Sequence, residues 1–286
     1  MKSLKNRTSL LLLPSMLFIL LPLYGMVAAI HQSFSVNNQW TLQNYIQLLE
    51  SERFVASTVF SLKTSLAATL ISLVIGLLLT RYFYTFLERN TPRLMVWLPM
   101  LFPHFVWGYM VILVLSETGV VSQMLQAAGW ISSSSEFPVW TRDSQGIGII
   151  TTYVWKEVPF VILMLLPVYS SIKSEYHDLV KTLGGNRWHR FKTVEWPHIL
   201  PVLIETFLIV FSFTLAAYEV PALLGTTFPE MLSVLSYDWF YGSSWDDRPL
   251  AFAAMVLLSL GVILLTAAAY LFLNKKRWKA MRGRST

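Results

Sequence analysis

Long runs of apolar residues alternate with short polar segments along this chain. Each run is long enough for a helix that crosses roughly 30 Å of hydrocarbon, which takes about 20 residues. The runs cover residues 10–30, 58–82, 94–115, 147–169, 201–224 and 251–273. The pattern predicts an all-α membrane protein with six transmembrane helices, and we treat residues 1–286 as a single integral-membrane domain.

The composition supports this interpretation. Hydrophobic residues make up 55% of the 286 residues and charged residues only 13%, with a mean hydropathy of +0.53. A soluble domain of this length needs a more highly charged surface. The net charge of +6 does not indicate nucleic acid, because the basic residues lie at the ends of the apolar runs. With no cysteine, the chain has no disulfide and no thiolate metal site.

The basic residues also predict the orientation. They gather before the first run, between the second and third, between the fourth and fifth, and after the sixth, whereas the other loops carry a single arginine each. Positive charge is typical of cytoplasmic loops. We therefore expect both termini and the segment 170–200 in the cytoplasm. The first run has no clear cleavage site and is expected to be retained.

The polar segment between the fourth and fifth runs carries a spaced motif. After Asp178, Leu179 and Val180, three residues precede Gly184. Nine more residues separate Gly184 from Val194, Glu195, Trp196 and Pro197. This resembles the Glu-Ala-Ala motif (EAA motif) of binding-protein-dependent ABC importer permeases, in which all these spacings recur. In this chain Asp178 occupies the position of the motif's Glu, Val194 that of its Ile and Trp196 that of its Leu. The larger departure is Leu179 and Val180 in place of Ala-Ala.

The residue types of this segment predict two short helices joined at a glycine corner. Leu179 and Leu183 share one helix face, and Gly184 or Gly185 can adopt the left-handed conformation that ends a helix. Asn186 is a favourable N-cap for a second short helix, which Pro197 is expected to end. Two short helices around a glycine corner would form a knob for a soluble partner; the alternative is an amphipathic loop on the bilayer. The expected ATPase-docking residues of this coupling loop are Asp178, Leu179, Val180, Leu183, Gly184, Gly185, Arg187, Trp188, Phe191, Val194 and Pro197.

A second resemblance lies in the fifth run. Glu219, Val220, Pro221, Leu223, Leu224 and Gly225 are similar to a run in the spermidine/putrescine and iron(III)-type branch of these permeases. Together the resemblances imply a permease subunit of a type I ABC importer, with a MetI-like permease core of five helices plus a peripheral N-terminal helix. They also imply a bacterial inner-membrane location.

The absence of a nucleotide-binding motif from the sequence indicates which partner proteins the chain needs. No G-x-x-x-x-G-K-[ST] loop is present, so ATP and Mg are expected to bind to a separate ATPase, and this chain is expected to need no cofactor. It also has no HExxH and no G-x-S-x-G, so we do not expect an enzyme. The expected partners are a cytoplasmic ABC ATPase dimer, a second permease subunit of the same or a different kind, an extracytoplasmic substrate-binding protein and the lipid bilayer, but no nucleic acid.

Charges inside the apolar runs indicate a possible substrate path. Lys156, Glu157, Tyr218 and Glu219 are its candidate residues, because charges within a membrane pair with one another or face water. Pairing of Glu219 with Lys63 or Lys156 is an equal alternative. His104 could relay protons, although a hydrogen bond to a carbonyl freed by the nearby proline is favoured.

The substrate class rests on the loop 226–249. It mixes acidic and aromatic residues, which suits a polyamine or other cation, although aromatic residues are also typical of any membrane interface. A different function remains open at this stage. A secondary transporter or channel could use Lys156, Glu157, Glu219 and Glu205, the last of which is expected near the cytoplasmic end of the fifth run.

Overall fold

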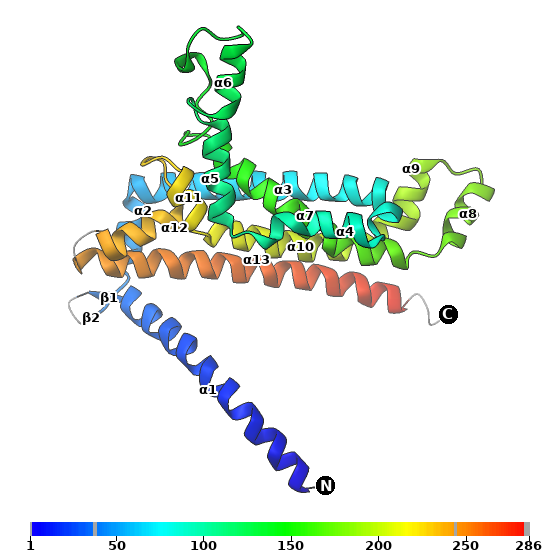
Figure 1. The fold of residues 1–286 in the computed structure, drawn as a ribbon. Helices are drawn as coiled ribbons and strands as arrows, with labels where there is room; N and C mark the ends of the chain where they lie inside the picture. Colours follow the sequence, from blue (N-terminus) through cyan, green and yellow to red (C-terminus); the bar gives the residue numbers. More distant parts are fainter. Residues whose placement is uncertain (1, 37–38, 243–244, 283–286) are drawn as a thin grey trace. The chain divides into compact units, whose positions relative to one another are not determined.

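The computed structural model describes residues 2–36, 39–242 and 245–282, most of them in α-helices (Figure 1). The chain divides into two compact units, which are described separately. One comprises Met1–Val55 and Leu235–Gly261, and the other comprises Ala56–Val234 and Val262–Thr286. The long helices α3 (Glu52–Leu87) and α13 (Arg248–Arg282) each contribute residues to both units, as does the short α12 (Leu232–Tyr237).

The first unit begins with α1 (Lys2–Ser33), whose interior includes two prolines. It continues with a two-stranded antiparallel sheet and a short helix: β1 (Ser35–Val36), β2 (Gln39–Trp40) and α2 (Gln43–Glu50). Asn44 on α2 donates a 2.9 Å hydrogen bond to the Ser33 carbonyl at the end of α1. After α12 the unit contains a π-turn, η3 (Asp238–Gly242), and a 3-10 turn, η4 (Trp245–Asp247).

The second unit contains most of the helices. In chain order these are the main part of α3, then α4 (Asn90–Leu101), α5 (His104–Leu115), α6 (Val120–Ala127), η1 (Ser134–Glu136), α7 (Ile147–Ser171), α8 (Ser174–Thr182), α9 (Arg187–Arg190), η2 (Phe191–Glu195), α10 (Trp196–Ala216) and α11 (Glu219–Leu224). Helix α7 contacts α4, α5, α10 and α11, so it lies at the centre of this unit. Of the residues in the apolar stretch of α7, 61% are buried, compared with 17–39% in the other candidate spans.

Close packing joins α3 to α7. A Cβ atom added to Gly76 of α3 would lie 2.5 Å from Val161 Cγ1 of α7, which no side chain tolerates. Gly76 therefore lets the two helices approach each other, as the small residues of this run predict. Val161 belongs to a core cluster with Leu165, Tyr169 and Ile199, so the close approach contributes directly to the core.

Five described helical segments are long and apolar enough to span a membrane: Glu52–Leu87, His104–Ala127, Ile147–Ser171, Arg187–Ala216 and Trp245–Leu273. A shorter apolar helix, Leu17–Ser33, precedes them. The all-α membrane fold with five core helices and an additional N-terminal helix is thus confirmed. The membrane boundaries of these helices stay predictions.

The third predicted run differs from its expected form. Residues 94–115 contain two helices, α4 and α5, instead of one. Phe102 between them is extended, with φ −96° and ψ 142°. The residue before a proline is disfavoured from the helical region, and Pro103 itself provides no N–H group. The break therefore follows from Pro103.

Candidate functional site

The glycine corner of the 170–200 segment has the expected form. Gly184 has a φ of +76°, in the left-handed region. The amide of Gly185 donates to the Val180 carbonyl at 2.8 Å, and that of Gly184 donates to the Lys181 carbonyl at 3.0 Å. This pair of bonds is the Schellman arrangement, which satisfies carbonyls at the end of α8. The Val180 side chain packs against Gly185, where an added Cβ would lie 2.6 Å from Val180 Cγ1.

Asn186 caps the next helix, as predicted. Its Oδ1 accepts hydrogen bonds from the amides of Trp188 and His189, both at 3.0 Å. Two of the amides that lack partners in the first turn of α9 are satisfied in this way. The direction in which the chain leaves the corner is therefore fixed by local hydrogen bonds.

The expectation that Pro197 ends the second short helix is wrong. Helix α9, the π-turn η2 and helix α10 form one continuous segment, Arg187–Ala216. In the π-turn the Trp196 amide bonds to the Phe191 carbonyl, five residues back. This wider turn places Pro197 within the first two positions of α10, where a missing N–H group costs little. Pro197 thus lies inside a continuous helical segment, and α9 runs through η2 into α10 without a break.

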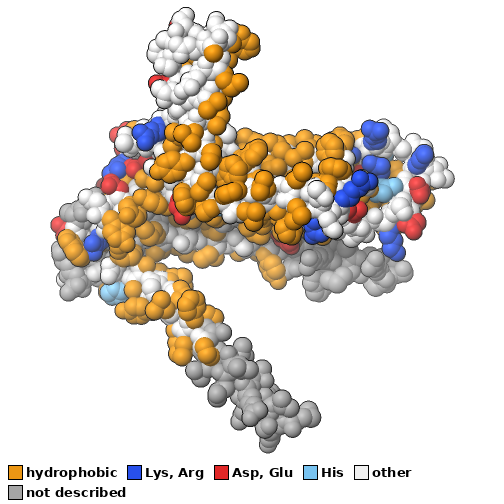
Figure 2. Space-filling model, in the orientation of Figure 1, with side chains coloured by type: hydrophobic (Ala, Val, Ile, Leu, Met, Phe, Trp, Pro, Cys, Tyr) orange, Lys and Arg blue, Asp and Glu red, His pale blue; other side chains and the backbone are white. Residues whose placement is uncertain are grey.

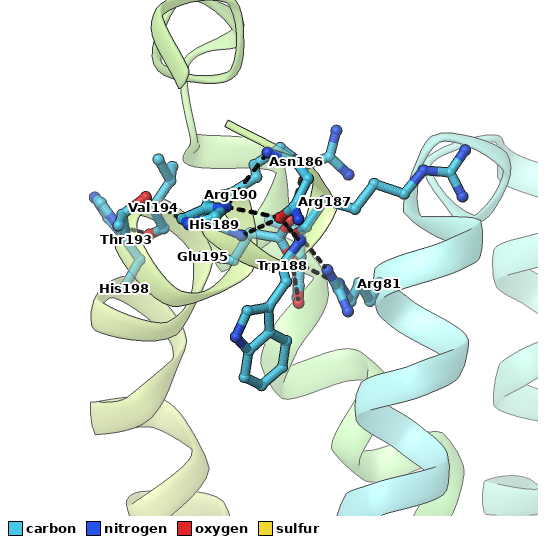
Figure 3. Close-up of polar contacts among 11 residues, drawn as sticks. Arg81, Asn186, Arg187, Trp188, His189, Arg190, Thr193, Val194, Glu195 and His198 are labelled. Atoms are coloured by element: carbon cyan, nitrogen blue, oxygen red, sulfur yellow. Dashed lines mark hydrogen bonds and ion pairs between the residues drawn. The ribbon is translucent and has the colours of Figure 1, made fainter. Parts of the chain in front are cut away.

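Glu195 holds this segment against the rest of the unit (Figure 3). Its carboxylate accepts hydrogen bonds from Arg81 Nε of α3 at 2.8 Å and from Arg190 Nε of α9 at 3.0 Å. Tyr169 Oη of α7 lies 3.4 Å from the same carboxylate. The Glu195 side chain is only 2% exposed, whereas the side chains of Arg81 and Arg190 are 17% and 42% exposed. A buried carboxylate with two guanidinium partners therefore links α3, α7, α9 and α10.

Phe191 strengthens the same junction. The Arg81 guanidinium carbon lies 4.4 Å from the centre of the Phe191 ring, within the range of a cation–π contact. Phe191 also packs against the core cluster around Tyr169. Sequence analysis gave Glu195 no role. The available signal was that Glu195 is the acidic residue of this basic segment nearest to the next apolar run, but that position does not identify Arg81 as its partner.

The predicted docking residues separate into an outward and an inward group. Exposed positions are Asp178, Leu179, Leu183, Gly184, Arg187, Trp188 and Pro197, and less exposed ones are Val180, Gly185, Phe191 and Val194. Three large apolar side chains stand out among the exposed ones: Leu179 is 57% exposed, Leu183 78% and Trp188 63%. Figure 2 shows basic side chains, with acidic ones among them, at this end of the unit, beside a surface that is apolar over α3. The corner thus presents apolar side chains among charged ones.

Lys156 and Glu157, two candidates for the substrate path, both have partners inside the unit. The Lys156 ammonium group donates to the carbonyls of Pro99 at 3.0 Å and Met100 at 3.1 Å, and also to that of Phe102. These carbonyls lie at the C-terminal end of α4, the end of a helix that carries a partial negative charge. Lys156 therefore caps the α4 side of the proline break.

His104, at the start of α5, lies on the other side of that break. Its Nε2 is 3.1 Å from Glu157 Oε1. The favoured expectation that His104 bonds a freed carbonyl is wrong, because the Glu157 carboxylate of α7 is close enough to accept a hydrogen bond from its Nε2. Adjacent residues of α7 thus hold the two ends of the broken helix, Lys156 through carbonyls and Glu157 through His104.

Glu219 and Tyr218 lie at a second break. Helix α10 ends at Ala216, and Glu219 begins the six-residue α11. Both side chains are exposed. Glu219 makes no ion pair with Lys63 or Lys156 in the described part of the chain, so the pairing alternative is not observed.

Several of the acidic and aromatic side chains of the loop 226–249 also have partners in the chain. Asp238 forms a 2.9 Å ion pair with Arg53. The Arg248 guanidinium carbon lies 3.5 Å from the centre of the Trp245 ring and 4.9 Å from that of Phe240. Arg248 therefore already occupies the faces of two of the aromatic rings that could attract a cationic ligand, those of Phe240 and Trp245.

The apolar helices form a bundle, and a polar corner held by buried ionic contacts lies at one end of it. This architecture fits a membrane transport subunit, and comparison with known proteins agrees. The chain belongs to the family of binding-protein-dependent transport system inner membrane components, whose profile matches residues 72–279. Members of this family are multi-pass permease components of ABC importers in the inner membrane, and they are not enzymes.

Two curated relatives are permeases of ferric transport systems. The chain is 27% identical over 269 residues to the putative ferric transport system permease protein FbpB 1 of Haemophilus influenzae, covering 92% of the chain and 40% of that relative. It is 25% identical over 266 residues to the ferric transport system permease protein FbpB of Actinobacillus pleuropneumoniae, covering 92% of the chain and 37% of that relative. The chain thus spans about two fifths of the length of these relatives.

A solved structure shares the fold. It is the crystal structure of a bacterial ABC transporter involved in the import of the acidic polysaccharide alginate, with a TM-score of 0.74. The match covers 93% of this chain and 94% of the other, at 20% sequence identity. The permease fold is therefore common to both chains, whereas their substrates cannot be compared at this identity.

Proposed function

We propose that the α8–α9 corner is where a separate ATPase drives this permease. The observation that carries the proposal is the combination of exposed Leu179, Leu183 and Trp188 with the buried Glu195 below them. Exposed apolar anchors in a polar surrounding are typical of a docking surface. A buried ionic junction beneath them resists bending. A force applied to the corner by the ATPase would therefore displace α9 and α10 instead of deforming the corner itself.

The proposed cycle needs further chains. A binding protein delivers the solute from outside, and two permease subunits, alike or different, enclose the path. An ATPase dimer that binds ATP and Mg closes against the two cytoplasmic corners. Because α9 continues into α10, the motion of the corner reaches a spanning helix directly. Both termini of this chain lie on the ATPase side in the proposal, as the charge bias of the loops predicts.

The candidate substrate path now has two kinds of residue. Glu219 and Tyr218 are exposed and are proposed to face the solute. Lys156 and Glu157 are proposed to support the path by fixing the α4–α5 break beside it. We propose a small cationic solute, such as a polyamine or a metal cation. The support for this class is the exposed carboxylate of Glu219 and the similarity to ferric permeases.

Substitution of Gly184 tests the docking role. A Cβ at this position meets no atom within 4 Å, but the φ of +76° disfavours every L side chain. In a left-handed conformation the Gly184→Val variant loses about 1–2 kcal/mol at the corner. We expect it to insert normally in the membrane while co-purification of the ATPase and uptake both fall.

A matched control is Gly261→Ala on α13, where an added Cβ also meets nothing within 4 Å and no positive φ occurs. This variant should retain the ATPase. Normal ATPase co-purification and uptake in Gly184→Val would contradict docking at the corner. Uptake that stops with a protonophore but persists after ATP depletion would instead identify an ion-coupled carrier.

A further inference from the structure

Helix α10 has a polar edge that sequence analysis did not recognise. His198, Glu205 and Ser212 follow one another at intervals of seven residues. Seven residues advance an α-helix by almost two full turns, so the three side chains lie along one side of α10. The next residue at this interval, Glu219, begins α11 after the helix break. All four belong to the same compact unit.

These side chains are accessible within the chain. His198, Glu205 and Glu219 are exposed and Ser212 is half-buried. Glu205 and Ser212 make no hydrogen bond or ion pair to the described residues, and neither is among those with further interactions. His198 uses Nδ1 for a 2.6 Å hydrogen bond to the Val194 carbonyl of its own helix.

The position of Glu205 makes its exposure costly. It is the tenth of the 21 residues of α10, close to the middle of this helix. At 1.5 Å per residue, about 14 Å of helix separates it from Trp196 and about 16 Å from Ala216. A carboxylate at this depth faces a water-filled path or a partner, because contact with lipid costs several kcal/mol.

The opposite side of α10 is apolar. Trp196, Leu200, Leu203 and Phe207 line a groove of about 310 Å³ that Leu73, Val74 and Leu77 of α3 complete. The accessible polar side chains of α10 thus lie on the side away from this groove, although Ile209 beside Glu205 is also exposed. This is the side on which a carboxylate could meet water. The Lys156–Glu157 pair has no such accessible side, because both residues are buried.

We propose that His198, Glu205 and Ser212 line the aqueous solute path of the transporter, and that Glu205 makes the middle of this path favour cations. The proposal deepens the proposed function, on which it rests, by assigning the path to one side of α10 and its charge preference to one residue. Glu219 then lies at the outer end of the same path, beyond the helix break. A negative charge in a narrow path raises the local concentration of cations.

Cysteine labelling tests the path without knowledge of the solute. The chain has no cysteine, so a single introduced thiol is the only one in it. Each variant replaces the natural copy in its own cells, and membrane vesicles of both orientations are treated with water-soluble methanethiosulfonate reagents. Thiolates react and un-ionised thiols in lipid do not. We expect His198→Cys, Glu205→Cys and Ser212→Cys to react at least about tenfold faster than Leu70→Cys.

Leu70 is a suitable control because it is apolar, 47% exposed and close to the middle of the 36-residue α3. Rates at positions 205 and 212 that are as slow as at position 70 would overturn the proposal. Such a result would mean that another chain, another part of this chain or lipid covers this side of α10. Labelling does not depend on ATPase docking, so it can fail or succeed independently of the Gly184→Val experiment.

The charge preference is tested in the Ser212→Cys variant. Positions 205 and 212 are about 10 Å apart along α10, where a unit charge still changes the local potential. The rate ratio of a cationic to an anionic reagent of similar size should fall about three- to tenfold when Glu205→Gln is added. Glu205→Asp keeps the charge and should keep the ratio, which controls for altered folding. An unchanged ratio in Glu205→Gln would refute the role of Glu205.

Discussion

Removal of the charge at Glu195 is the most direct test of the junction beneath the docking corner. In the Glu195→Gln variant, Arg81 and Arg190 lose a carboxylate that is 2% exposed. Breaking a buried ion pair costs about 3–5 kcal/mol. The amide still accepts one hydrogen bond, and Arg190 is 42% exposed and therefore solvated. We expect a loss of about 2–3 kcal/mol at this junction.

This loss of stability should be confined to the segment that Glu195 holds in place. A change of that size increases the population of the detached segment about 30- to 160-fold. Hydrogen exchange of the purified protein in lipid discs measures it, because the amides of residues 186–195 exchange when the segment detaches. The exchange of these amides should accelerate by the same factor, while the buried centre of α7 around Val161 stays protected.

A matched control is Glu175→Gln on α8, an exposed carboxylate without an ion pair to the described residues. This variant should change stability by less than about 0.5 kcal/mol. Exchange of residues 186–195 that rises less than about threefold in Glu195→Gln would refute the role assigned to Glu195. The segment would then be held mainly by the packing of Phe191 and Val194.

Two further predictions concern the helix core. Gly76→Leu should lower the stability by about 1–3 kcal/mol, because the new side chain collides with Val161, whereas Gly261→Ala, in open space within a helix, should not lower it. Lys156→Met should cost about 2–3 kcal/mol by leaving carbonyls at the α4–α5 break without a donor. The exposed Lys63→Met is its control. Thermal unfolding in detergent measures both, and equal melting temperatures for variant and control would contradict them.

Local patterns in the sequence were sufficient for much of the docking corner. The positive φ at Gly184 and the cap at Asn186 depend on residues at most a few positions away. The cap was predicted at Asn186, and the left-handed residue was predicted as either Gly184 or Gly185. The expected stop at Pro197 was wrong for a reason that local rules do not contain. The π-turn before it moved this proline into the first turn of α10, where it is tolerated.

Charged side chains inside the unit were the least predictable. Arg81 and Glu195 are 114 positions apart, and Lys156 bonds a carbonyl 57 positions away. Their sequence neighbourhoods show that a charge lies within or beside an apolar run, but not which helix supplies its partner. The same limitation applied to Glu205, since its depth depends on where α10 begins.

The sequence alone thus determined that the chain is an α-helical membrane protein, where its α8–α9 corner lies, and which spacing marks it. These features arise from hydropathy, turn chemistry and capping, which act over a few residues. Only the tertiary structure decided that Glu195 braces the corner, that Lys156 and Glu157 hold a broken helix, and that α10 has a polar side. Buried charges need partners, and those partners come from helices that are distant in the chain and adjacent only after folding.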